Sequence, residues 1–274
     1  PKWRERKLSR RAKAIIKKMT ANYHTHTPRC RHASGSENEY IGKAMSRGLE
    51  ILGFSDHTPY LFPGDYYSTF RMFPEQTEDY FTTIERMKKE YAGKITIYSG
   101  LEAEYYPKHF SALIDLIKPY HPDYLILGQH FTGNEYDGHY SGAPTEDESI
   151  LRAYVDQVVE GISTGLYSYI AHPDLINYVG DERIYEKHIL RLCEAAKKLG
   201  IPLEINMLGL SGNRHYPCDR FWMIAAGVGN DVVLGCDAHE PDAVANPETL
   251  KKAYDFAAKF DLKPLERVKL HPVV

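Results

Sequence analysis

The chain has 274 residues, of which 43% are hydrophobic and 26% charged, and its formal net charge is -3. This length and composition are typical of a globular protein with a sizeable core, and the near-neutral charge argues against nucleic acid or a membrane as the main partner. No apolar run approaches the roughly 20 residues that span a bilayer, we find no secretory segment, and none of the 4 cysteines belongs to a CxxC pair, so we expect free thiols in the cytoplasm.

Residues 1–20 are strongly basic and contain a single acidic residue. Their apolar side chains fit a partly amphipathic helix. Such a segment can anchor a protein to nucleic acid or a membrane, or it can pack as a solvated helix on the body of the protein. We expect the second arrangement, with a helical N-terminal extension over residues 1–20 and a single domain over residues 21–274.

From residue 21 onward, a short apolar run is repeatedly followed by a polar end and then by a helical pattern. The seven apolar runs lie at residues 21–26, 49–57, 94–106, 123–131, 167–175, 201–210 and 231–239. Strands that alternate with helices predict an α/β fold with a parallel sheet and right-handed crossovers. The pattern alone fits a closed barrel as well as an open doubly wound sheet. The absence of a GxGxxG motif after the first run, and of a P-loop, argues against a nucleotide-binding open sheet.

Side chains that commonly bind metals gather at the carboxyl ends of these runs. They are His24, His26, His32, His57, Glu102, His130, His172, Asp237 and His239. Active sites of α/β folds lie at this edge of the sheet, so we expect these side chains to meet there. Any one of them taken alone has a fair alternative as a hydrogen-bonded structural residue, but their shared placement favours a metal site. The remaining histidines are scattered, and we assign them no role.

This set is too large for a single metal ion, since a four-coordinate zinc takes three or four protein ligands. It suits two or three ions, and its mixture of imidazole and carboxylate groups suits zinc, manganese or iron better than magnesium or calcium. Ions with open positions generate a hydroxide and stabilise the charge on a phosphoryl or carbonyl group. Strand alternation places Asp237 and His239 on one face and turns Cys236 away from the metals.

The order of these motifs resembles that of a known family. HTH with a third histidine, SDH, GLE, GQH, AHPD and DAH follow one another as in the PHP (polymerase and histidinol phosphatase) phosphoesterases. Within that family, the segments GLEAEY, AHPD, LEIN and GNRHYP are most similar to the histidinol-phosphate phosphatases. The resemblance implies a distorted (β/α)7 TIM-like barrel and a centre of three divalent metal ions, which would be zinc, manganese or iron.

The resemblance also implies how the ligands are shared. His24, His26, Glu102 and Asp237 would hold one metal, Glu102 would bridge to a second metal bound by His130 and His172, and His32, His57 and His239 would hold the third. A metal-bridging hydroxide would attack the phosphorus, and Asp237 or His239 would handle the proton for the leaving alkoxide.

Three residues are candidates for binding the substrate. Arg214 matches the family's arginine in the loop after the sixth strand and would grip the phosphate, with an ordinary surface arginine as the alternative. Asn206 would hydrogen-bond the substrate or orient the site. Glu104 lies two residues past Glu102 on the same face of the strand and would meet a cationic substrate amine.

We therefore expect a metal-dependent phosphomonoesterase that hydrolyses L-histidinol phosphate to L-histidinol and phosphate in histidine biosynthesis. Another PHP phosphoesterase, acting on a nucleotide or another small phosphate ester, would differ only in the loops at 59–74 and 131–147. An amidohydrolase acting on C–N bonds usually has a strand-end lysine as a metal bridge, which this sequence lacks. A non-enzymatic metal-binding module would use the basic N-terminus on nucleic acid. None of these patterns predicts an oligomeric state.

Overall fold

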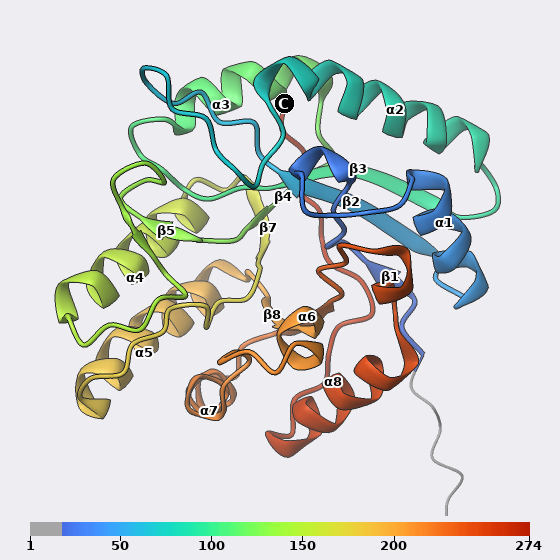
Figure 1. Cartoon of the computed structure of the whole chain (residues 1–274). Coiled ribbons are helices and arrows are strands. Elements are labelled where there is room, and N and C mark those ends of the chain that lie inside the picture. The colour runs from blue at the N-terminus through green and yellow to red at the C-terminus, as the bar shows by residue number, and fades with distance from the viewer. Residues whose placement is uncertain (1–17) are drawn as a thin grey trace, which may run out of the picture.

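The computed structural model describes residues 18–274, and Figure 1 shows strands at the centre with helices around them. The helical extension expected over residues 1–20 lies outside the described residues except for its last three, which are not helical. The domain boundary at residue 21 therefore stays a prediction. Within the described part of the chain, no helix has the length and apolarity needed to cross a membrane.

Seven parallel strands form one sheet in the order β1-β2-β3-β4-β7-β8-β9. Their bounds are Ala21–Asn22 (β1), Ile51–His57 (β2), Thr96–Glu102 (β3), Tyr124–Leu127 (β4), Tyr167–Ile170 (β7), Leu203–Asn206 (β8) and Val232–Gly235 (β9). The two edges of the sheet meet at a parallel bridge between Thr25 and Ala238, where the His26 amide donates to the Ala238 carbonyl over 2.9 Å. This bridge closes the sheet at the carboxyl ends of its strands, which confirms the distorted (β/α)7 barrel and excludes the open sheet.

The first strand is shorter than the sequence predicts. A strand is expected over residues 21–26, but ladder pairing covers only β1 and resumes at the bridge made by Thr25. The Asn22 side chain donates to the Thr25 hydroxyl and to the His24 carbonyl, and its oxygen accepts from the Cys236 amide over 2.9 Å. A side chain that takes over backbone partners in this way competes with the strand ladder.

The helices lie outside the barrel (Figure 1). Their bounds are Glu37–Ser46 (α1), Thr77–Glu90 (α2), Phe110–Ile117 (α3), Glu148–Ser163 (α4), Glu182–Leu199 (α5), Met207–Ser211 (α6), Asp219–Val228 (α7) and Pro247–Lys259 (α8). A short hairpin joins Phe131–Thr132 (β5) to His139–Tyr140 (β6), and 3-10 turns lie at Pro28–Cys30, Pro74–Gln76, Lys118–Tyr120 and Pro241–Ala243. Local chemistry sets where helices begin: Ser36 and Glu39 form a capping box at α1, and Asp181 caps α5.

The barrel encloses a core of its own, separate from the layer between strands and helices. Inside it, Tyr23 and Tyr124 pack with Tyr169 and with aliphatic side chains, of which Ile51 and Val233 lie near the starts of their strands. The Tyr124 hydroxyl lies 2.7 Å from the carbonyl oxygen of Tyr23 and 3.0 Å from that of Phe54, so it has partners. Gly53 and Gly100 make room for this ring, because a Cβ at either position would lie 2.3 or 2.4 Å from Tyr124 atoms. The packed interior supports the polar carboxyl end of the barrel.

Candidate metal centre

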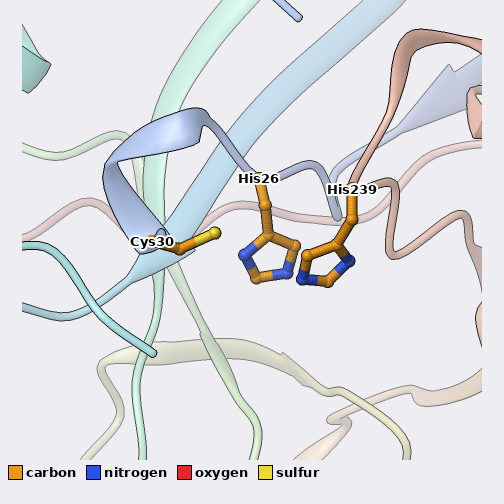
Figure 2. Close-up of side chains that lie close together, drawn as sticks. All are labelled: His26, Cys30 and His239. Carbon is orange, nitrogen blue, oxygen red and sulfur yellow. The ribbon is translucent and has the colours of Figure 1, made fainter. Parts of the chain in front are cut away.

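The side chains expected to bind metal lie together at the carboxyl end of the barrel. The rings of His26 and His239 stack with their centroids 4.0 Å apart and their planes inclined by 17° (Figure 2). The His57 ring lies 4.4 Å from that of His26, and the His32 ring lies 4.5 Å from that of His239. Barrel closure therefore places residues from the two ends of the domain within one cluster.

Glu102 lies at the centre of this cluster, and its two oxygens face different histidines. Its Oε2 lies 3.4 Å from His24 Nε2, 3.5 Å from His26 Nε2 and 3.1 Å from His57 Nδ1, while its Oε1 lies 2.8 Å from His172 Nε2 and 3.5 Å from His130 Nε2. One carboxylate thus stands between two groups of imidazoles, which is the arrangement that a bridging ligand requires.

Several buried ring nitrogens of the cluster make no hydrogen bond of good geometry, although carboxylate oxygens lie 3.1–3.5 Å from some of them. These nitrogens are His24 Nε2, both ring nitrogens of His26, His57 Nδ1, His172 Nδ1 and His239 Nε2. Leaving a buried polar atom unpaired costs about 1–3 kcal/mol, so a concentration of such atoms at one place points to a ligand. Imidazole nitrogens combined with the carboxylates of Glu102 and Asp237 suit divalent zinc, manganese or iron. The residues present therefore fit divalent metal ions.

The backbone of the site departs from regular strand geometry. His172 and Asp237 have left-handed φ angles of 28° and 48°. Non-glycine residues in this region cost on the order of 1–3 kcal/mol, and such strain clusters at functional sites. Gly128, just past β4, leaves room for Glu102, because a Cβ there would lie 1.9 Å from Glu102 Oε1. The strand ends are thus shaped to place these side chains.

Two further carboxylates, which the sequence analysis does not assign to the site, lie behind its histidines. Glu204 Oε2 lies 2.9 Å from His24 Nδ1, and Asp56 Oδ1 lies 3.5 Å from His26 Nδ1. Carboxylates in this position fix the tautomer and orientation of a metal-binding imidazole. The alternation of strand faces is a signal that identifies Glu204, because it lies two residues before Asn206 on the same strand.

The histidines and carboxyl groups of the cluster shift one another's pKa values. Burial alone would lower the pKa of His24, but neighbouring carboxylates, Glu204 first, outweigh it and raise that pKa well above its usual range. For His239, burial and then a neighbouring histidine lower the pKa to about 3. Burial would raise the pKa of Glu102 and Asp237, yet the surrounding histidines hold the pKa of each carboxyl well below its usual range. Both carboxyl groups therefore stay ionised, as a cation site requires.

Arg214 lines a cavity of about 490 Å³ that also opens onto Glu102, Asp237 and His239. Its side chain is exposed, and its Nη1 donates to the Tyr216 hydroxyl over 2.7 Å. Among the described residues it is the one lysine or arginine that lines this cavity. The position is the one that a phosphate-binding arginine would need.

The other two candidates for substrate contact lie behind the cavity wall. Asn206 is fully buried, and its Nδ2 donates to Asp237 Oδ2 over 3.0 Å, which favours an orienting role over contact with the substrate. Glu104 is also fully buried. Both of its oxygens are paired with the Arg71 guanidinium, and one also faces His130 Nδ1. This pairing does not agree with the expected contact between Glu104 and a substrate amine.

The rest of the cavity wall is aromatic and apolar. It is formed by Phe70, Phe131, Tyr140, Leu175, Leu208 and Tyr216. Phe70 comes from the loop at 59–74, and Phe131 and Tyr140 come from the β5–β6 hairpin. The rings of Phe70 and Phe131 stack 6.1 Å apart. The two loops that the sequence analysis singles out therefore both border the cavity, and their rings suit a planar or apolar part of a small molecule.

The cysteines near the site differ in their orientation. Cys236 turns away, as alternation predicts, and its sulfur accepts a hydrogen bond from a backbone amide in the outer layer. The sulfur of Cys30 instead points toward the His26 ring (Figure 2), and the ligand atoms of Cys30, His26 and His239 lie within 4.8 Å of one another. Burial, and next the charge of Asp56, raise the pKa of the Cys30 thiol. A protonated thiol is a poor metal ligand.

The chain matches the PHP domain family over residues 22–207. A probable histidinol-phosphatase from Deinococcus radiodurans is 32% identical over 230 residues, which cover 81% of this chain and 86% of that protein. A histidinol-phosphatase from Bacillus subtilis is 26% identical over 254 residues, which cover 79% of this chain and 92% of that protein. A solved structure of a histidinol phosphate phosphatase from Lactococcus lactis, complexed with zinc, L-histidinol and phosphate, is 20% identical. The match covers 92% of this chain and 100% of that one at a TM-score of 0.69, which shows a shared fold.

Proposed function

The chain belongs to the PHP domain family, and from this premise we propose that it is a histidinol-phosphatase, which hydrolyses the phosphate monoester of L-histidinol phosphate to L-histidinol and phosphate. The observation that carries the proposal is the cluster of buried, unpartnered histidine nitrogens around Glu102, at a cavity also lined by Arg214. The two curated relatives described above carry the name of this activity. The substrate is a small molecule, and the reaction calls for neither nucleic acid nor a membrane.

The grouping of ligand atoms supports a centre of three divalent ions. Sets whose ligand atoms lie within 4.8 Å of one another include His24, His26 and Asp237; His24, Glu102 and His172; and His32, His57 and His239. We assign the first ion to the first set together with Glu102, the second to Glu102, His130 and His172, and the third to the last set. When bound, such ions polarise phosphoryl oxygens and lower the pKa of water.

The residues of the chain itself position the ester. The Arg214 guanidinium is held by the Tyr216 hydroxyl through Nη1, which leaves further N–H groups for a bidentate contact with phosphate oxygens. Asp237 and His239 both line the cavity and are unprotonated at neutral pH, so either can take up the proton released by the attacking water and pass it to the leaving alkoxide. The bond of 3.0 Å from Asn206 keeps Asp237 oriented for this role.

The aromatic wall suits the imidazole ring of the proposed substrate. Pairs of aromatic rings contribute about 0.5–1.5 kcal/mol beyond the burial of their area. The faces of the same rings attract a cation, so the substrate's ammonium group can also lie against this wall. Phe70, Phe131 and Tyr140 supply rings for both contacts, and they come from the two loops in which we expect this activity to differ from that of other PHP phosphoesterases.

Phosphate release from L-histidinol phosphate by the purified protein tests the proposal. The assay compares protein as isolated, protein after chelation, and protein resupplied with zinc or manganese. We expect turnover that is lost on chelation, restored by metal, and faster than on a nucleoside monophosphate or other small phosphate esters. Protein that holds metal but leaves L-histidinol phosphate intact would reject the assignment, and a preference for a nucleotide would favour another PHP phosphoesterase.

A further inference from the structure

Arg71 is a buried cation beside the metal centre that the proposed function does not use. Its side chain is 2% exposed. Nη2 and Nη1 donate to the two oxygens of Glu104 over 2.8 and 3.1 Å, and Nε donates to Glu135 Oε2 over 2.8 Å. Nη1 also reaches the Thr58 carbonyl over 3.1 Å. Removing such charges from water is costly unless the geometry is excellent, and apolar side chains of similar volume often replace them without loss. Stability alone is therefore a weak reason for this cluster.

Glu104 connects Arg71 to a candidate metal ligand. Its Oε1, which accepts from Arg71 Nη2, also lies 2.8 Å from His130 Nδ1. A proton on Nδ1 leaves Nε2 of the same ring as the nitrogen with the free lone pair. That Nε2 faces the centre, 3.5 Å from Glu102 Oε1. Arg71 holds Glu104 by both oxygens, so Glu104 can hold the His130 ring in one tautomer and one orientation.

Arg71 also fixes the loop that carries it. The preceding residue, Phe70, lines the cavity, and its ring lies 5.9 Å from that of His130. The Arg71 guanidinium carbon lies 4.5 Å from the centroid of the same ring. Glu135, which follows β5, accepts from Arg71 and also from the Tyr66 hydroxyl over 2.9 Å. The Arg71 side chain thus connects both loops that line the cavity to Glu104, which in turn contacts the candidate metal ligand His130.

We propose that Arg71 is a positioning residue, which orients His130 toward the metal centre through Glu104 and sets the cavity wall through Phe70. The inference rests on the proposed function for the identity of the metal centre. It adds the claim that the aromatic loop at 59–74 and the second metal site are coupled through one guanidinium.

The variant Arg71→Lys tests the coupling. Lysine keeps the charge but cannot span Glu104 bidentately and also reach Glu135. We expect the zinc affinity of the site that includes His130 to fall roughly 10- to 100-fold, as for other residues that support metal ligands. Competition with a chromophoric chelator in the absence of substrate measures this affinity, and zinc per chain in buffered zinc gives the occupancy. Glu104→Gln should act in the same direction, and the double variant should lose less than the sum, because both residues act on one histidine.

Arg220→Lys is the matched control. Arg220 also pairs with a carboxylate, Glu182, and with a backbone carbonyl, that of Tyr178, but it does not line the cavity. Its replacement should leave zinc binding unchanged. Circular dichroism and cooperative unfolding check the fold of every variant, and if Arg71→Lys does not fold, the nearly isosteric Glu104→Gln carries the test.

Two results would overturn the role of Arg71: wild-type zinc affinity in both Arg71→Lys and Glu104→Gln, or an equal loss in Arg220→Lys. The zinc measurement needs no substrate. A wild-type protein that binds zinc but does not hydrolyse L-histidinol phosphate would therefore reject the proposed function without deciding the role of Arg71.

Discussion

The two ends of the barrel differ in whether their buried polar groups have hydrogen-bond partners within the protein. At the amino-terminal end, where β4 begins, the Tyr124 hydroxyl lies 2.7 and 3.0 Å from two backbone carbonyl oxygens, inside a cluster of aliphatic and tyrosine side chains. At the carboxyl end, ring nitrogens of His24, His26 and His57 are buried without a hydrogen-bond partner. The same strands build both ends. One end satisfies its own polar atoms and stabilises the fold, and the other leaves them for ions that the chain does not supply.

Replacing Glu102 should have the largest effect, because it should abolish the function of the carboxyl end without disturbing the fold. Glu102→Ala removes the carboxylate that stands between two groups of histidines. Electrostatic stabilisation by bound metals is worth several kcal/mol, so we expect turnover of L-histidinol phosphate to fall on the order of 10³-fold at saturating substrate. Zinc content should fall with it, while circular dichroism stays that of the wild type. A folded Glu102→Ala protein with full phosphatase activity would contradict the assignment of the carboxyl end.

Metal removal should have the next largest effect, which is a decrease in the free energy of unfolding. An ion that binds only the folded state adds about 4 kcal/mol to the free energy of unfolding when its free concentration is 1,000 times its Kd. We therefore expect chelated protein to unfold at markedly lower denaturant concentration than zinc-loaded protein. Calcium, which prefers shells of oxygen ligands, serves as the control and should not restore the difference. Equal unfolding curves with and without zinc would mean that the unpartnered nitrogens are not metal ligands.

The sequence predicts the candidate metal ligands at the carboxyl end better than it predicts the closure of the barrel or the residues that support those ligands. In a parallel sheet all carboxyl ends meet, so residues such as His57, Glu102 and Asp237 can be placed together from their positions in the apolar runs. Closure depends on a single bridge between Thr25 and Ala238, which no local pattern encodes.

Residues that support the metal ligands can be predicted from the sequence when they lie on a strand, but not when they lie in an irregular loop. Glu204 follows the alternation of its strand, so its direction toward the site can be derived. Arg71 lies in a long aromatic loop without periodicity, and its burial depends on the path of that loop over Glu104 and Glu135. The pairing with Arg71 also explains why Glu104 does not line the cavity, although strand alternation predicts that it shares a face with Glu102.

Arg214 offers a smaller test within the functional end. Arg214→Ala removes hydrogen bonds to a charged group, each worth about 1.5–3 kcal/mol, so kcat/KM for L-histidinol phosphate should fall roughly 10- to 100-fold. Zinc content should not change, because the hydrogen bond of the Arg214 side chain goes to Tyr216 and not to a candidate metal ligand. Arg214→Lys should recover part of the loss, since lysine supplies charge without the bidentate geometry. An unchanged kcat/KM in Arg214→Ala would make this residue an ordinary surface arginine.

The smallest effect should come from the amino-terminal end, where Tyr124→Phe deletes a hydroxyl whose single proton is shared between two carbonyl oxygens. We expect the free energy of unfolding to fall by about 1–2 kcal/mol, because a buried hydrogen bond is lost, while zinc binding and turnover stay at wild-type levels. Tyr106 supplies a matched control in the layer outside the barrel: its hydroxyl is equally buried but has no hydrogen-bond partner among the described residues. Tyr106→Phe should therefore cost no stability, or add some, in the same denaturant titration. Equal losses in the two variants would show that packing around the hydroxyl oxygen, and not hydrogen bonding, decides stability at both positions. The contrast between the barrel ends would then rest on the metal-binding end alone.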